Sequence, residues 1–275
     1  MKLRVLKSKI TDQYNNFRFW LSATNSLFFH IIYKCFYSPK KGSISHIIDR
    51  YSLDHKMDFT VVQIGANDGM INDPIHKFIK RDRWKGVLLE PQKFVFDKYL
   101  KKVYRKDRGI KLINAAIGDN DGSTFLYKVG FSNARWAHGL ASFERETLEK
   151  SIQSGYVKRK AAKESVDIPL EPDKQIVCEE VKVISPKTLV REYGLDRINL
   201  LQIDTEGYDY NIIKMFKIKE TQPGLIVFEN LHLSDSDYRA CIKYLNDNNY
   251  KTRTIGSNTL AMLNPGKEYL SFFEV

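Results

Sequence analysis

The chain has 275 residues, of which 43% are hydrophobic, and a formal net charge of +11. A packed core is therefore expected, in one large α/β domain with additions or in two small domains. The number and spacing of the three cysteines, Cys35, Cys178 and Cys241, exclude a disulfide framework and a zinc site, which fits a reducing, cytoplasmic compartment. The charge is compatible with nucleic acid, an anionic membrane or an acidic substrate, and it does not indicate a fold.

The N-terminal segment, residues 1–42, is predicted to be a basic, aromatic-rich helical extension with six lysines and two arginines. Polar residues interrupt its apolar stretch, 17–37, so it is a poor membrane-spanning helix, and it lacks the features of a cleaved signal peptide. Helical spacing places these side chains along one side: Phe17, Trp20, Leu21, Leu27, Phe28, Ile31, Cys35 and Phe36. We favour packing of this side against the rest of the protein or a partner such as a second subunit, because aromatic stripes at this spacing usually belong to a core. An interfacial helix on a membrane surface is the alternative.

Strand and helix patterns alternate through the remaining domain, residues 43–275. Strands are predicted at 59–65, 85–91, 110–119, 122–129, 198–204 and 223–230, followed by a hairpin at 250–263. Helices are predicted at 43–53, 73–82, 92–105, 183–194, 208–217 and 236–249. This order indicates a mostly parallel sheet with helices on both faces, which binds ligands beyond the carboxyl ends of its strands. The segment 130–182 interrupts the pattern and is predicted to form a lid or an acceptor-binding insertion.

The end of the first strand carries a glycine loop, "GANDG", with Gly65 and Gly69 at its ends and Asn67 between them. Glu90 ends the next strand, 21 positions after Gly69 (90 − 69). An acidic residue about 20 positions after such a loop is placed to hold a ribose hydroxyl. The loop alone is a weak signal, because Gly65 could serve only as a turn and Glu90 only as a strand-end charge. Together they favour a cofactor that contains a nucleoside.

Seven segments resemble one protein family, the FkbM-type methyltransferases, which use S-adenosylmethionine. They are "VVQIGANDG", "WKGVLLEPQ", "INAAIGDNDGSTFLY", "HGLASF", "LLQIDTEGYDYNII", "LIVFEN" and "NTLAML", and they span about 57–265. The resemblance implies a Rossmann-like, seven-stranded class I methyltransferase sheet that ends in an antiparallel hairpin. It also implies methyl transfer to a hydroxyl group, often on a sugar of a glycan or a glycosylated natural product.

The resemblance also implies roles for individual residues at the strand ends. It places Gln63, Gly65, Asn67 and Gly69 around the methionine part of the cofactor, and Glu90 on the ribose. It places Asn114, Ala115 and Ala116 at the adenine edge. Asp204 faces the methyl sulfonium, where a carboxylate favours binding of the positive charge.

Methylation of an alcohol requires a base or a metal ion that draws the hydroxyl proton away. The candidates for this role are Asp204, Glu206, Glu229, Asn230 and His232. Asp204, Glu229 and Asn230 follow two strands that are neighbours in such a sheet, and their oxygen atoms suit Mg²⁺. In the alternative, which we favour slightly, Asp204 orients the cofactor and Glu229 holds a sugar hydroxyl without a required metal. His232 is a candidate general base, although a lone histidine is more often a structural hydrogen-bonding residue.

The predicted acceptor is a glycan or a nucleotide sugar, bound by Trp136, His138, Glu206 and Tyr208. Trp136 could stack on a sugar face or close a small hydrophobic cluster. The rival functions are RNA or small-molecule methylation and a non-catalytic cofactor-binding scaffold at a membrane. RNA is disfavoured as a partner because the chain has no N-P-P-[FYW] stretch and no legible RNA-binding module.

Overall fold

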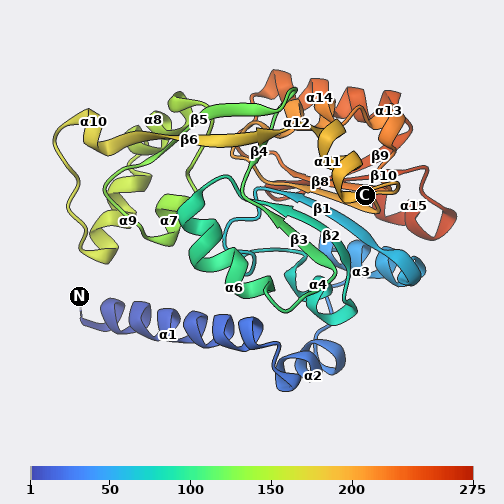
Figure 1. Ribbon diagram of the computed structural model, residues 1–275, viewed down its shortest axis with the longest axis horizontal. Coiled ribbons are helices and arrows are strands. Elements are labelled where there is room, and N and C mark those ends of the chain that lie inside the picture. Colours follow the sequence, from blue (N-terminus) through green and yellow to red (C-terminus); the bar gives the residue numbers. More distant parts are fainter. Residues whose placement is uncertain (1, 275) are drawn as a thin grey trace.

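The computed structural model of the protein describes the backbone of residues 2–274 and the side chains of residues 13–274 other than Met57. Its main sheet has seven strands in the order β3-β2-β1-β7-β8-β10-β9 (Figure 1). The strands are β1 (Thr60–Ile64), β2 (Lys85–Leu89), β3 (Ile110–Ile113), β7 (Leu200–Ile203), β8 (Leu225–Glu229), β9 (Tyr250–Ile255) and β10 (Asn258–Leu263). The first five run parallel, and β10 pairs antiparallel with both β8 and β9. This is the predicted class I methyltransferase sheet with its terminal hairpin.

Helices cover both faces of the main sheet (Figure 1). They are α3 (Ile44–Asp54), α4 (His76–Asp82), α5 (Lys93–Val95), α6 (Lys101–Tyr104), α11 (Pro186–Tyr193), α12 (Asp209–Met215), α13 (Ile218–Thr221), α14 (Asp235–Asp247) and α15 (Lys267–Phe273). A 3₁₀ turn, Lys56–Asp58, precedes β1, and a π-helical turn, Phe96–Leu100, joins α5 to α6 within the predicted helix 92–105.

The core has two layers because neighbouring residues of each strand point to opposite faces of the sheet. Val61 and Leu200 pack with α3, α4 and α6 on one face, whereas Val62 and Leu201 pack with α11, α12 and α14 on the other. All four side chains are fully buried. Burial of each such side chain contributes roughly 1.5–3 kcal/mol, so the continuous apolar runs specify strands covered on both sides.

Side-chain caps fix where several helices begin. The hydroxyl of Ser43 accepts a hydrogen bond from the amide of His46 and so caps α3. The helix predicted at 73–82, with Asp73 and Pro74 as its cap and first turn, begins later, because α4 starts at His76. The Asp73 carboxylate accepts hydrogen bonds from the amides of Ile75 and His76, 2.8 and 2.9 Å long, so it caps the turn that leads into the helix.

A second sheet of three strands corrects the predicted pattern. It consists of β4 (Ala116–Ile117), β5 (Gly122–Val129) and β6 (Ile176–Ile184), in the order β4-β6-β5. The predicted strand 110–119 is therefore two strands, broken where Asn114 turns its side chain toward the carbonyls of Glu90 and Pro91. Because β6 extends to Ile184, the predicted helix start at 183 was also wrong, and α11 begins at Pro186.

Four short helices lie between β5 and β6: α7 (Arg135–His138), α8 (Arg145–Gln153), α9 (Tyr156–Glu164) and α10 (Pro172–Gln175). They extend from one end of the molecule together with the arch formed by β5 and β6 (Figure 1). The segment predicted as an insertion, 130–182, thus ends in a long strand of the second sheet.

The N-terminal segment forms two helices, α1 (Lys2–Thr24) and α2 (Leu27–Cys35), outside the layer of α4 and α6 (Figure 1). Leu21, Phe29 and Tyr33 are its buried hydrophobic residues. The side that we predicted to be packed is exposed except for Leu21. The chain breaks at Asn25, which has a left-handed φ of 50°, so the two helices do not share one continuous stripe. No helix among residues 2–274 is long and apolar enough to cross a membrane.

Candidate active site

A cavity lies beyond the carboxyl ends of β1, β2 and β7, beside β4 of the second sheet. Its lining includes residues that were predicted to form the site: Gly65, Asn67, Glu90, Ala115, Ala116, His138, Asp204 and Glu206. It also includes Pro91, Gln92, Gly139, Ala141, Phe143 and Thr205, which the sequence did not single out. The strand ends on which the prediction relied therefore do converge on one place.

Gly65 is required by its backbone conformation and by a close approach. Its φ is 77°, and a Cβ atom at this position would lie 1.9 Å from the carbonyl oxygen of Asp204. Its amide donates to the carbonyl of Leu89 over 3.1 Å, which ties the start of the glycine loop to β2. Only glycine fits between these strand ends without displacing the backbone of Asp204.

Glu90 is buried at the edge of the cavity, and each of its carboxylate oxygens accepts one backbone hydrogen bond. The donors are the amides of Asn67 and Gln92, both 2.9 Å away. Burial raises the pKa of Glu90 to about 7. A carboxylate has about four acceptor positions, so two remain for the hydroxyls of a ligand after the amides are satisfied.

Three predicted cofactor residues do not line the cavity and instead support it. Gln63 donates from Nε2 to the Asp73 carboxylate over 3.0 Å. A Cβ atom on Gly69 would meet Leu100 at 2.6 Å, so this glycine serves packing. Asn114 donates to the carbonyls of Glu90 and Pro91, 2.8 and 2.9 Å away, and thereby fixes the segment that carries Glu90.

Asp68, within the glycine loop, is a supporting residue that the sequence analysis missed. Its carboxylate accepts hydrogen bonds from the amides of Met70 and Ile71, each 2.8 Å long. It also forms an ion pair with Arg135 of α7. Burial raises the pKa of Asp68, and the Arg135 guanidinium opposes this shift. The loop is thus held by the inserted segment as well as by the sheet.

The predicted acceptor residues divide between the cavity and the surrounding packing. His138 lines the cavity, and its backbone carbonyl accepts a hydrogen bond from Nε2 of Gln92 over 3.0 Å. Trp136 is buried in a cluster with Val129 and Val157, and its indole donates to Glu164 over 3.1 Å. The ring of Trp136 therefore closes a hydrophobic cluster, and the predicted stacking on a sugar does not fit its position.

Tyr208 is the remaining predicted acceptor residue, and it lies beside the cavity. Its ring meets that of Phe143 edge-on, with centroids 5.7 Å apart. Phe143 lines the cavity, so Tyr208 supports the cavity wall from behind.

Several carboxylates gather at the ends of β7 and β8. Asp204 lines the cavity, and its side chain is exposed there. Lost hydration raises the pKa of Asp204 well above its usual value, and repulsion from Glu229 and Glu206 adds to the shift. A cationic group in this cavity would be favoured by the same charges.

Asp209, at the start of α12, connects the two strand ends, and the sequence analysis did not identify it. One carboxylate oxygen accepts from the hydroxyl of Thr205 over 2.9 Å, and the other accepts from the amide of Glu229 over 3.2 Å. Burial raises the pKa of Asp209 to about 6. The acidic spacing in "DTEGYD" was a signal, because its second aspartate falls at the first position of a helix.

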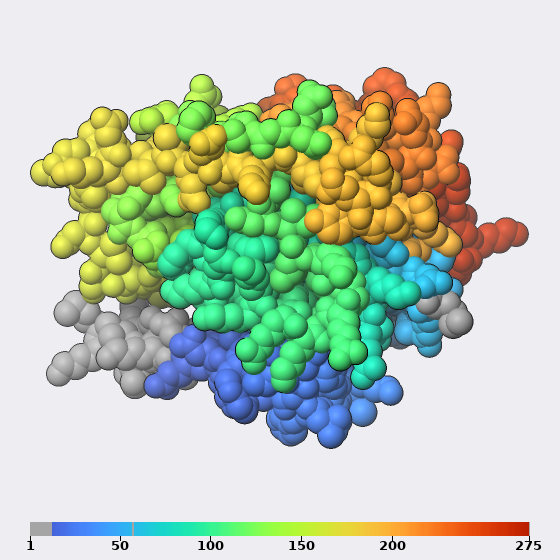
Figure 2. Space-filling view, viewed as in Figure 1, coloured from blue at the N-terminus to red at the C-terminus, as the bar shows by residue number. Residues whose placement is uncertain are grey.

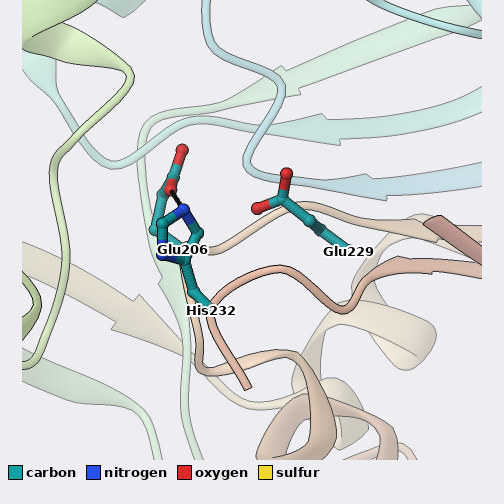
Figure 3. A group of neighbouring side chains, drawn as sticks. All are labelled: Glu206, Glu229 and His232. Atoms are coloured by element: carbon teal, nitrogen blue, oxygen red, sulfur yellow. Dashed lines mark ion pairs between the residues drawn. The ribbon is translucent and has the colours of Figure 1, made fainter. Parts of the chain in front are cut away.

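Glu206, Glu229 and His232 face one another, with ligand-type atoms within 4.8 Å of each other (Figure 3). Nε2 of His232 and a carboxylate oxygen of Glu206 are 2.9 Å apart. This hydrogen bond, together with the negative charge nearby, raises the pKa of His232. Burial and repulsion from Glu206 raise the pKa of Glu229 to about 7, whereas the charge of His232 lowers it.

The Mg²⁺ site predicted at Asp204, Glu229 and Asn230 stays a prediction. Among histidine, cysteine and acidic side chains of the described residues, the group close enough to share a cation is Glu206, Glu229 and His232. An imidazole is a poor ligand for Mg²⁺, which prefers oxygen. Moreover, Nε2 of His232 already bonds to Glu206.

Two buried oxygens near this group have no hydrogen-bond partner in the part of the chain that the structure describes. They are Oε2 of Glu229 and Oδ1 of Asn230. Buried polar atoms are normally hydrogen-bonded, so unpaired acceptors at a strand end indicate a place where a ligand donates a hydrogen bond.

Residues 63–252 match the family described as "Methyltransferase FkbM domain". The chain belongs to this family. It is accordingly an S-adenosylmethionine-dependent methyltransferase of the FkbM type, as the seven quoted segments predicted. No curated protein matches the chain.

The FkbM methyltransferase from Methylobacillus flagellatus KT is 13% identical, with a TM-score of 0.43 over 74% of this chain and 43% of its own. This chain therefore spans less than half the length of that protein. Precorrin-6y C5,15-methyltransferase from Geobacter metallireducens GS-15 is 11% identical, with a TM-score of 0.39 over 83% of this chain and 94% of its own. An O-methyltransferase from Bacillus cereus, in complex with SAH, is 10% identical, with a TM-score of 0.38 over 82% of both chains.

Proposed function

We propose that the protein transfers a methyl group from S-adenosylmethionine to a hydroxyl group of a sugar, in a glycan or a nucleotide sugar. The observation that carries this proposal is the unpaired, buried Oε2 atom of Glu229, beside the cavity residues Asp204 and Glu206. A carboxylate acceptor at this place suits removal of a hydroxyl proton.

The residues around the cavity fit the cofactor. Glu90 retains two acceptor positions for the ribose hydroxyls, and Ala115 and Ala116 offer a small apolar surface for a flat base. Asp204 would face the sulfonium, whose positive charge would lower the carboxylate pKa and hold it ionised. When bound, the cofactor supplies an activated methyl group on a sulfur that leaves readily.

Glu229 is the proposed general base. Glu229 would accept the proton of the acceptor hydroxyl, and the bound cofactor would supply the methyl group that replaces this proton on the acceptor oxygen. The pKa of Glu229, about 7, lies near neutral pH, where a base is both available and strong enough to take a proton. Glu229 and His232 were both candidates from the sequence, and this assignment gives the role of base to Glu229.

We propose that His232 and Glu206 position Glu229 and influence its ionisation. Because Glu206 raises the pKa of His232, the imidazole is favoured in its charged form, and its charge lowers the pKa of Glu229. The charge of His232 therefore favours the ionised form of Glu229, against the repulsion from Glu206. The unpaired Oδ1 atom of Asn230 suits another hydroxyl of a sugar, which donates hydrogen bonds readily.

A methyl-transfer screen with labelled S-adenosylmethionine tests the proposal, using nucleotide sugars, lipid-linked glycans and RNA as acceptors. We expect label in a sugar acceptor, and a loss of about 10²-fold or more in kcat for Glu229→Gln. The matched control is Glu146→Gln, which removes an exposed carboxylate of α8. Label only in RNA, or full activity of Glu229→Gln, would contradict the proposed acceptor or the proposed base, respectively.

A further inference from the structure

Large apolar side chains project outward from both N-terminal helices. We call this set the N-terminal apolar surface: Phe17, Trp20, Leu27, Phe28, Ile31 and Phe36, with 45% to 79% of each side chain exposed. The rings of Phe17 and Trp20 stack at 6.1 Å, so they present one aromatic patch on α1. Residues from 13 onward in this segment lie along the lower edge of the molecule in Figure 2.

Polar contacts fix the end of α1 and the turn that joins it to α2 to the methyltransferase body. Nζ of Lys80, on α4, donates to the Ser22 carbonyl over 3.2 Å and to the Asn25 side chain over 3.1 Å. The same ammonium pairs with Asp107 over 2.5 Å. A buried ammonium needs these partners, so α1 and α2 cannot simply turn their apolar side inward.

A cationic cavity of about 410 Å³ lies beside the N-terminal apolar surface. Leu27 and His30 of α2 form one wall, and the exposed side chains of Arg83, Lys106 and Arg108 belong to the rest of the lining. The carboxylate of Asp107, also in this lining, is already paired with Lys80. These residues precede β2 and β3, so the cavity lies at the amino ends of the strands, away from the candidate active site.

The sequence adds further positive charge to this part of the chain. Residues 1–42 contain eight basic residues and one acidic residue, Asp12, which gives +7 of the total charge of +11. An exposed apolar surface with tryptophan and phenylalanine, next to concentrated positive charge, suits the interface of an anionic bilayer. A second copy of the chain would bring two such positive surfaces together, and their repulsion opposes that pairing.

We propose that α1 and α2 dock the protein on an anionic lipid bilayer. The N-terminal apolar surface inserts at the level of the headgroups, and the cationic cavity takes the phosphate of one lipid. The active-site cavity then remains in water at the opposite ends of the strands. An acceptor carried on a lipid would thereby be collected at the membrane surface.

Co-sedimentation of the full chain with phosphatidylglycerol and phosphatidylcholine vesicles tests the proposal. We expect binding to phosphatidylglycerol that weakens with salt, and at least tenfold weaker binding to phosphatidylcholine. Trp20→Ser/Phe28→Ser should lose at least tenfold in vesicle affinity. The matched control is Phe125→Ser/Leu170→Ser, which removes two other exposed apolar side chains, from β5 and from the loop before α10. This variant should bind as the unmodified chain does.

A second pair of variants tests the cavity without altering the apolar side chains. Arg83→Gln/Arg108→Gln should weaken binding to phosphatidylglycerol at least threefold more than Lys158→Gln/Lys163→Gln, which removes two exposed charges from α9. Inorganic phosphate should reduce vesicle binding of the unmodified chain but not of Arg83→Gln/Arg108→Gln. Equal losses in the two charge pairs would overturn the cavity's role. Absence of vesicle binding, or a dimer in light scattering that Trp20→Ser/Phe28→Ser dissolves, would overturn the membrane proposal.

Discussion

The buried carboxylate of Asp209 accepts a hydrogen bond, 3.2 Å long, from the backbone amide of Glu229. Its other oxygen holds the Thr205 hydroxyl at 2.9 Å, so one side chain sets the spacing between the ends of β7 and β8. The acidic residues of the candidate site stand on these two ends. Their geometry therefore depends on a residue that does not itself line the cavity.

Replacement of Asp209 should separate this positioning role from chemistry. Asp209→Ala leaves the Glu229 amide and the Thr205 hydroxyl without partners, which should cost about 1–3 kcal/mol of unfolding free energy. We expect kcat to fall as well, because Glu229 loses its support. Asp209→Asn keeps the shape and one acceptor oxygen, and it should recover part of both losses. Denaturant unfolding and single-turnover kinetics measure the two effects, and an Asp209→Ala variant of unchanged stability and kcat would contradict them.

Gly65→Ala should abolish cofactor binding and destabilise the fold. The new methyl group would meet the Asp204 carbonyl at 1.9 Å, and φ of 77° disfavours any side chain. Gly256→Ala is the matched control, because its φ of 63° is equally left-handed but no atom lies within 4 Å of the place that its new methyl group would take. Thermal unfolding and calorimetric titration should show the larger losses for Gly65→Ala. Equal losses in both variants would mean that backbone strain alone, and not the contact with Asp204, determines the effect.

Stability of the ligand-free protein should fall as pH rises from about 4 to about 7. Burial raises the folded-state pKa of Glu90 and Glu229 from 4.5 to about 7, and that of Asp209 from 3.8 to about 6. A group with a raised pKa stabilises the fold while it is protonated, and this stabilisation is lost as pH rises through the folded value. Glu229→Gln should therefore raise the melting temperature at pH 8 and reduce its change between pH 5 and pH 8. The measurement is the melting temperature of each variant between pH 5 and pH 8, with Glu146→Gln as the control. Equal pH dependence in Glu229→Gln and Glu146→Gln would contradict the role given to Glu229.

Chelation should leave methyl transfer intact. The group that could share a cation contains an imidazole, and that imidazole already bonds to Glu206. Exhaustive treatment with EDTA should accordingly change kcat by less than about twofold, because the proposed base acts without a Lewis acid. If activity disappeared and added Mg²⁺ restored it, Glu229 would have to act as a metal ligand.

Much of the fold and of the cavity could be predicted from the sequence because strands of a parallel sheet end in polar residues at a common edge. Gly65, Glu90 and Asp204 each follow an apolar run, so their convergence followed from the order of elements. Strand β6 was missed because charged Glu179, Glu180 and Lys182 interrupt its pattern of alternating apolar and polar residues. Its partner strand β5 also ends 47 positions earlier in the chain (176 − 129).

Other features depend on tertiary contacts that periodicity does not encode. The buried side of α1 and α2 is selected by polar partners, above all Lys80, and not by the aromatic stripe. Trp136 is of a residue type that often stacks on sugars, but it is buried in the hydrophobic cluster of the insertion. Gln63 and Asn114 proved to be supports because their amides reach backbone and carboxylate groups outside the cavity.

The strand-end cavity should bind S-adenosylmethionine through Glu90. Calorimetric titration of the cofactor into the unmodified protein and into Glu90→Ala tests it without knowledge of the acceptor. We predict binding by the unmodified protein and at least a tenfold weaker affinity for the variant, about 1.4 kcal/mol or more. Equal affinity in the two proteins, with the fold of Glu90→Ala intact, would contradict the account.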